Sequence, residues 1–117
     1  FEEMGKQQEA LDAYDKAIQI KPDFFVALNN RGLVLDAMGS HTEAIEAYDK
    51  ALKINPNFDA VWFNKACAQA LLSRKEDALN SLKKAIELNS GYKSIAKNNP
   101  DFLKFKGDAD FETIVGE

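Results

Sequence analysis

"MGKQQEALDAYDKAIQIKP", residues 4–22 of this 117-residue chain, returns in altered form at residues 38–56 as "MGSHTEAIEAYDKALKINP". The two stretches agree at 11 of 19 positions, and their starts at Met4 and Met38 define a period of 34. A further step of the same length leads to residues 72–90, which contain Glu-Asp-Ala-Leu and Lys-Ala-Ile but lack the Gly and the closing Pro. A fixed period of this length is the sequence signature of a stacked-repeat protein.

Each copy has the pattern of an amphipathic helix, and the segments between the copies, 24–38 and 58–72, are also helical in pattern. One repeat unit is therefore a pair of helices, with tight turns expected near Gly39 and Ser73. A single pair cannot cover its own apolar face, so neighbouring pairs must stack on one another. The apolar face is clearest in the helix at 43–54, where it comprises Ala44, Ile45, Ala47, Tyr48, Ala51 and Leu52.

Polar residues mark the expected helix ends. Ser40-x-x-Glu43 and Ser73-x-x-Glu76 match the capping box, in which a hydroxyl and a carboxylate satisfy free backbone N–H groups. Two further residues, Asp23 and Asn57, are expected to cap the intervening helices. Pro22 and Pro56 should end the helices that precede them, because proline lacks an N–H and clashes with the preceding turn.

Composition excludes several classes of protein. Fifteen basic and nineteen acidic residues give a net charge of −4, which argues against nucleic acid as a partner because phosphate binding needs a basic face. No apolar run approaches the roughly 18 residues of a membrane span. A single cysteine, Cys67, excludes an internal disulfide and suits a reducing compartment, so we expect a cytoplasmic protein.

The pattern of large, small and aromatic residues resembles the tetratricopeptide repeat (TPR) family. Residues 59–92 match less fully than residues 25–58, since Gln69 replaces a large residue and Ser90 the proline, and Arg31 and Lys65 stand where the family usually has Leu. The resemblance implies an all-α fold, a TPR-type helix-turn-helix superhelix (α-solenoid). The matching residues are Leu28, Gly32, Leu35, Gly39, Ala44, Tyr48, Ala51 and Pro56, then Trp62, Ala66, Ala78, Leu82 and Ala85.

The same resemblance divides the chain into four parts. Residues 1–24 are expected to be a partial repeat (the end of helix A plus helix B), followed by full repeats at 25–58 and 59–92 and by C-terminal capping helices at 93–117. Because helix B of the partial repeat would lack its partner, we expect further repeats before residue 1. In the last part, Pro100 should interrupt a helix at 92–98, and Asp108 should cap a later one.

Catalytic chemistry finds little support in the sequence. His41, the only histidine, lies in a turn, whereas Cys67 lies within a helix, so a Cys–His pair is not expected. There is no phosphate-binding glycine loop and no Cys/His spacing of a metal site. We therefore expect no enzyme, no metal and no cofactor.

Recognition of a protein or peptide finds more support. In TPR arrays the first helices line the concave surface, and the resemblance also places Asp36 there. Asn30, Asn64 and Asn98 recur once per repeat period, and their amides could pair with the backbone of an extended peptide. Asparagine is also common at this position in the family, where it can reflect the geometry of the helix pair. The expected groove residues are Val26, Asn29, Asn30, Leu33, Phe63, Asn64, Cys67, Leu71, Lys97 and Asn98.

The expected function is a protein–protein interaction scaffold that binds a peptide segment of a partner in the concave TPR groove. A clamp for chaperone C-termini is disfavoured, because it resembles the asparagine row but also needs Lys or Arg in the groove, where only Lys97 qualifies. Two alternatives remain: a self-assembly module, with self-association through the open N-terminal helix, or the docking arm of a larger multidomain enzyme.

Overall fold

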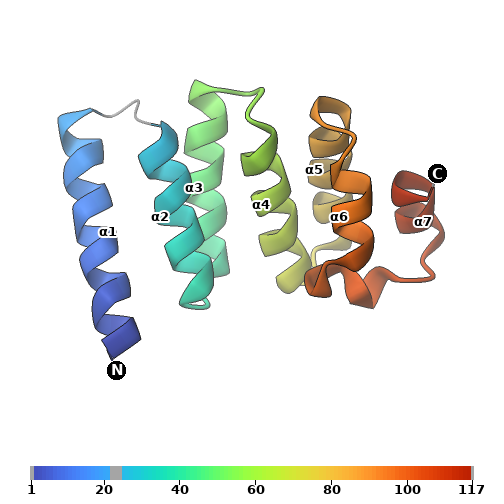
Figure 1. Ribbon diagram of the computed structural model, residues 1–117, viewed down its shortest axis with the longest axis horizontal. Coiled ribbons are helices and arrows are strands. Elements are labelled where there is room, and N and C mark those ends of the chain that lie inside the picture. The colour runs from blue at the N-terminus through green and yellow to red at the C-terminus, as the bar shows by residue number, and fades with distance from the viewer. Residues whose placement is uncertain (1, 22–24, 117) are drawn as a thin grey trace. The chain divides into compact units, whose positions relative to one another are not determined.

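The computed structural model describes residues 2–21 and 25–116, and this part of the chain is helical throughout, without a β-strand (Figure 1). The chain divides into two compact units, Phe1–Pro56 and Asn57–Glu117. Unit 1 contains α1 (Glu2–Ile20), α2 (Phe25–Ala37) and α3 (His41–Ile54). Unit 2 contains α4 (Asp59–Leu71), α5 (Lys75–Leu88), α6 (Tyr92–Asn98), the 3₁₀-helix η1 (Pro100–Phe105) and α7 (Ala109–Val115). The all-α prediction is confirmed.

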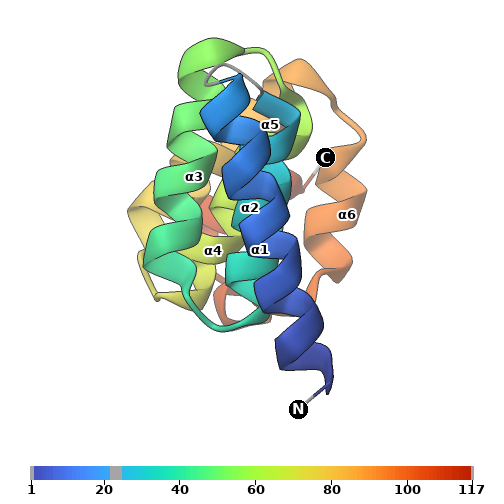
Figure 2. The same ribbon diagram turned by 90° about the vertical axis from the view of Figure 1, so that its left-hand side faces the viewer.

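In unit 1, α2 packs against both α1 and α3. Figure 2 shows α1 in front of α2, with α3 beside them. The buried residues of α3 are the six that its sequence period predicted, from Ala44 to Leu52. Burial of this stripe against α2 joins the two helices into a hairpin. In unit 2, α4 and α5 pack against each other in the same way.

A close contact between Gly32 and Tyr48 sets the distance between α2 and α3. The Tyr48 side chain is fully buried, and its hydroxyl donates a hydrogen bond to Asp36 Oδ2 at 2.6 Å. A Cβ atom at residue 32 would lie 2.7 Å from Cδ1 and 2.9 Å from Cζ of this ring. Glycine is therefore required here because the ring occupies the space of a side chain.

The corresponding pair in unit 2, one repeat later, combines a smaller large residue with a larger small residue. Leu82 stands at the place of Tyr48, Ala66 at the place of Gly32, and both are fully buried. The smaller leucine leaves room for one methyl group on the facing helix. Each hairpin thus fills a similar space with its own pair of side chains, as close packing of protein interiors demands.

The N-terminal helix differs from the expectation. Residues 1–24 were expected to comprise the end of one helix, a turn and a second helix, but α1 runs without a break from Glu2 to Ile20, through Gly5. Continuing the helix makes backbone hydrogen bonds at the modest cost of about 1 kcal/mol for an internal glycine.

The turns after α2 and α4 share one geometry. Gly39 has a φ of +83° and the N–H of Ser40 bonds to the carbonyl of Leu35 at 2.8 Å, while Ser73 has a φ of +61° and the N–H of Arg74 bonds to the carbonyl of Gln69 at 2.9 Å. Both are Schellman motifs, in which a left-handed residue ends the helix. The expected turns at Gly39 and Ser73 are confirmed.

Several expected helix caps are wrong. Ser40 is the N-cap of α3 but makes no side-chain cap bond, and Arg74, not Ser73, precedes α5. Both residues also complete the preceding Schellman turn, and their ψ angles of 63° and 73° differ from the extended backbone of a usual N-cap. Phe58, not Asn57, is the N-cap of α4.

The other expected helix ends have mixed outcomes. Pro56 follows the end of α3 as expected. Asp23 and Pro22 lie outside the described residues.

Exchanging the two turn residues tests this geometry. Replacing Ser73 with glycine should stabilise unit 2 by about 0.5–1 kcal/mol, because a side chain at positive φ costs about 1–2 kcal/mol and the lost Ser73 contact to Lys104 offsets part of the gain. The reverse change, Gly39→Ser, should destabilise unit 1 by about 1 kcal/mol. Urea unfolding measures the stability of both variants. Equal stability of the wild type and the two variants would contradict this account of the turns.

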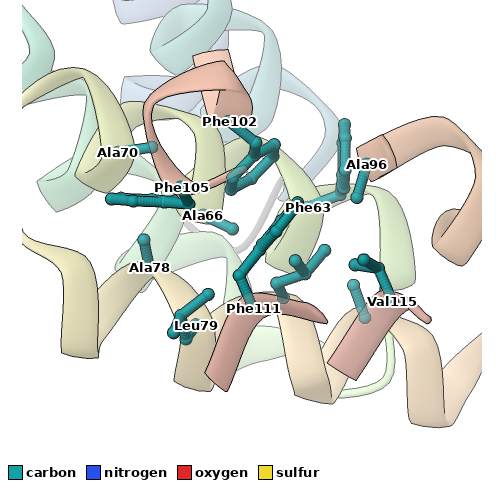
Figure 3. Close-up of a cluster of buried hydrophobic side chains, with 12 residues drawn as sticks. Phe63, Ala66, Ala70, Ala78, Leu79, Ala96, Phe102, Phe105, Phe111 and Val115 are labelled. Carbon is teal, nitrogen blue, oxygen red and sulfur yellow. The ribbon is translucent and has the colours of Figure 1, made fainter. Parts of the chain in front are cut away.

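The C-terminal segment supplies much of the core of unit 2. Three of its phenylalanines, Phe102, Phe105 and Phe111, meet Phe63 of α4 in a cluster of aromatic rings (Figure 3). Phe102 lies at the centre, with ring centroids of its neighbours at 5.9 to 6.3 Å, and is 1% exposed. The segment after α5 is therefore an integral part of the unit.

Polar contacts fasten this segment at two places. Lys104 Nζ donates to the carbonyl oxygen of Ala70 at 2.7 Å, near the end of α4, where a cation also complements the helix dipole.

Asp108 caps α7 as expected, accepting bonds from the N–H groups of Asp110 and Phe111. Its Oδ2 lies 2.5 Å from Lys75 Nζ, and this hydrogen bond, followed by the bond from Phe111, lowers the pKa of Asp108, while the same contact raises the pKa of Lys75. Pro100 begins η1 directly after α6, which confirms the expected interruption.

Candidate functional site

Three expected groove residues of α2 share one face of that helix. Val26, Asn30 and Leu33 follow one another at the four- and three-residue spacing of a helical stripe. Val26 and Leu33 are each 42% exposed, and Asn30 between them is half-buried. Two large apolar side chains thus flank an amide on an open surface of unit 1.

Asn29 and Asp36 do not belong to this open surface, contrary to expectation. Asn29 is buried, with an exposed fraction of only 7%. Asp36 turns toward α3, where its two oxygens bind Tyr48 and His41, with Nδ1 of His41 2.9 Å from Oδ1. Because both oxygens are engaged within unit 1, Asp36 holds the hairpin together rather than facing a ligand.

On α4, the structure corrects the expected role of Phe63. Its ring is 8% exposed and stacks on Tyr92 at a centroid distance of 4.8 Å, with Phe102 at its other side. α6 and η1 cover the ring, so it cannot receive a ligand side chain in this state. Burial, followed by the negative charge of Asp59, raises the pKa of the Tyr92 hydroxyl.

The remaining groove residues of α4 are more accessible. Leu71 is 42% exposed, and Asn64 and Cys67 are half-buried. Cys67 forms no disulfide and packs against the aromatic core cluster. These three residues recur at the spacing of one helix face, like the stripe on α2.

Lys97 and Asn98 end α6 and are both exposed. The side-chain N–H of Asn98 donates to the carbonyl of Ser94, one turn earlier in the same helix, at 3.0 Å. Asn98 therefore uses one donor locally and keeps its oxygen for solvent or a ligand. The asparagine row formed by Asn30, Asn64 and Asn98 stays a prediction.

Residues 2–21 and 25–116 contain no group of three or more His, Cys, Asp or Glu side chains that could hold a metal ion. His41 is the first residue of α3, not a turn residue as expected, and it is held by Asp36 of α2. Within the same residues, no helix is both long enough and apolar enough to cross a bilayer.

Tyr92 is the residue of this region that the sequence period missed. It covers Phe63, yet it lies where the repeat pattern breaks down, after Gly91. An aromatic residue at the start of α6, the first short helix after α5, was the available signal. Without the fold of the C-terminal segment, its partner could not be named.

Three family models match the sequence, and all describe the same repeat. Models described as "Tetratricopeptide repeat" match residues 25–58 and 47–80, and one described as "TPR repeat" matches residues 1–39. Together they extend over residues 1–80, from α1 to the first part of α5. The chain belongs to the tetratricopeptide repeat family. The expected family and fold class are thereby confirmed.

Solved TPR structures share this arrangement of helices. Two crystal structures of MamA match with TM-scores of 0.80 and 0.69, at 21% and 32% sequence identity, covering 95% and 82% of this chain. This TPR chain spans only 64% and 51% of those two chains. The TPR2B domain of yeast Sti1, in a complex with pHsp70, matches with a TM-score of 0.71 at 25% identity, over 95% of this chain and 84% of that one. No curated protein matches the sequence.

Proposed function

We propose that this TPR chain is a protein–protein interaction scaffold that binds a peptide segment of a partner protein through the first helices of its repeats. The observation that carries this proposal is the open stripe on α2, where Val26 and Leu33 are each 42% exposed on either side of Asn30. Burying two such side chains against a ligand yields favourable apolar contact. An amide between them can accept from and donate to a peptide backbone.

The comparison with yeast Sti1 supports a partner protein as the source of the ligand, because its TPR2B domain was solved in a complex with pHsp70. The open face of α2 carries no cation, so a carboxylate clamp has no counterpart there. Lys97 on α6 is the one basic residue among the proposed groove positions. The ligand of α2 is therefore a segment with apolar side chains rather than a charged chain terminus.

On α4 and α6 the proposal retains Asn64, Cys67, Leu71, Lys97 and Asn98 as contact residues. Asn29 and Phe63 are assigned a supporting role, because they are buried behind the surface. The function requires no catalysis and no cofactor. A single cysteine outside any disulfide favours a reducing compartment such as the cytoplasm.

Selection of peptides from a random phage-displayed library against the chain tests this function. Affinities of the selected peptides are then measured by calorimetry for the wild type and for a Val26→Ser/Leu33→Ser variant. We expect at least about a tenfold loss, because each 1.4 kcal/mol of lost apolar burial changes the affinity about tenfold. Circular dichroism of the variant should be unchanged, since both side chains are open to solvent.

The matched control is Ile20→Ser/Leu103→Ser, which removes two exposed apolar side chains from α1 and η1. Its peptide affinities should equal those of the wild type. If the Val26/Leu33 variant bound the selected peptides as tightly as the control does, the α2 surface would not be the binding site.

A further inference from the structure

Unit 1 contains a second surface that the proposed function does not use. A pocket of about 530 Å³ opens between α1, α2 and α3. Its apolar lining comes from all three helices: Ile18 of α1, Leu28 of α2, and Ala47 and Ile54 of α3. A volume of this size falls within the range of ligand-binding pockets in proteins.

The pocket lies on the opposite side of α2 from the open stripe. Leu28 and Arg31 line it, and at about 100° per residue they point away from Val26 and Leu33. Both α1 and α3 pack against α2 and border the pocket with it. A ligand in the pocket therefore does not compete with a peptide on the stripe.

The rim of the pocket is positively charged. It carries Arg31, Lys50 and Lys53 against one acid, Asp15. Nε of Arg31 lies 2.7 Å from Oδ1 of Asp15, so this acid is already paired. Lys50 and Lys53 are exposed and form no ion pair within the described residues. This basic rim stands out in a chain whose net charge is −4.

We propose that this pocket docks an acidic amphipathic helix of a partner protein. A large apolar side chain of that helix enters between Ile18 and Ile54, and carboxylates beside it meet Lys50 and Lys53. The two lysines are three residues apart on α3, so they lie on neighbouring positions of one face and match acids spaced three or four residues apart on the partner helix. The combination of an apolar floor with unpaired amines selects this chemistry over a neutral or basic segment.

A synthetic 16-residue helical peptide serves as the probe, with leucines at i, i+3 and i+7 and glutamates beside them. Amide shifts in two-dimensional NMR spectra of the chain should move at Ile18, Ala47 and Ile54. A peptide with lysine in place of each glutamate, and one with serine in place of each leucine, should cause no shifts there at equal concentration.

The variant Lys50→Gln/Lys53→Gln should weaken binding of the acidic peptide about five- to tenfold, and added salt should reduce the difference. Glutamine is uncharged, only one atom shorter than lysine and similar in helix propensity, so the fold is retained. The matched control Lys16→Gln/Lys106→Gln changes the net charge equally at exposed sites outside the pocket and should bind like the wild type.

Three results would overturn the proposal: no shift at millimolar peptide, equal weakening by both double variants, or shifts confined to Val26 and Leu33. The last result would place the peptide on the α2 stripe and so favour the proposed function alone. Loss of peptide binding on the stripe, with shifts at the pocket intact, would instead remove the proposed function and keep this inference.

Discussion

Replacing Phe102 with alanine should lower the free energy of unfolding of unit 2 by about 3–5 kcal/mol, the usual cost of removing a buried aromatic ring. Phe102 is 1% exposed and contacts three other phenylalanine rings, so its loss leaves a cavity at the centre of the core. The single tryptophan, Trp62, packs against this cluster and makes its fluorescence a local reporter. Urea unfolding followed at this residue measures the effect.

The adjacent Leu103 provides the control, because its side chain is 57% exposed. Leu103→Ala should change the stability by less than about 0.5 kcal/mol. Similar effects of the two variants would mean that η1 does not pack against α4 in solution. In that case Phe63 would be accessible, and its expected role in the groove would return.

Replacing Gly32 with alanine should destabilise unit 1 by about 1–2 kcal/mol. Alanine gains about 1 kcal/mol of helix propensity over glycine, but overpacking a core costs typically about 1–3 kcal/mol. The added methyl would overlap the Tyr48 ring, which is fully buried and fixed by its bond to Asp36. We therefore expect the steric cost to exceed the gain. Hydrogen exchange of the α2 and α3 amides, which reports unit 1 alone, measures it.

A double-mutant cycle identifies the cause. In a Tyr48→Leu background the same Gly32→Ala change should be neutral or stabilising, because leucine and alanine form the corresponding pair in unit 2. Tyr48→Leu alone should destabilise, since it leaves a cavity and removes the hydroxyl that Asp36 binds. An equal cost of Gly32→Ala in both backgrounds would exclude the ring contact as its origin.

The helices and turns were predictable because the repeat period carries three independent signals. Apolar spacing located the helix faces, Pro56 located an end, and Gly39 located a reversal. The error at Ser73 shows where a local motif misled. Ser73-x-x-Glu76 matches a capping box, but the period aligns Ser73 with Gly39, which has the same left-handed backbone. A helix start depends on the ψ angle of one residue, and no residue type fixes that angle.

The candidate site was less predictable, because it depends on what covers each helix. Val26 and Leu33, named from the family pattern, are open to solvent, and their role in binding stays a prediction. Phe63 was misplaced, since Tyr92 and Phe102 cover it from α6 and η1, which follow the second helix hairpin. The basic pocket was missed because its residues come from three helices and none is unusual for its own helix.

The unequal pairs Gly32–Tyr48 and Ala66–Leu82 also limit how such a gene can rearrange. Recombination that exchanged α3 for α5 alone would set a tyrosine ring against the methyl of Ala66 and leave a hole beside Gly32. Duplication or loss of a whole helix hairpin keeps each large residue with its small partner. The heritable unit of this array is therefore the complete hairpin, and crossovers between its two helices should be selected against even where the sequences on both sides are nearly identical.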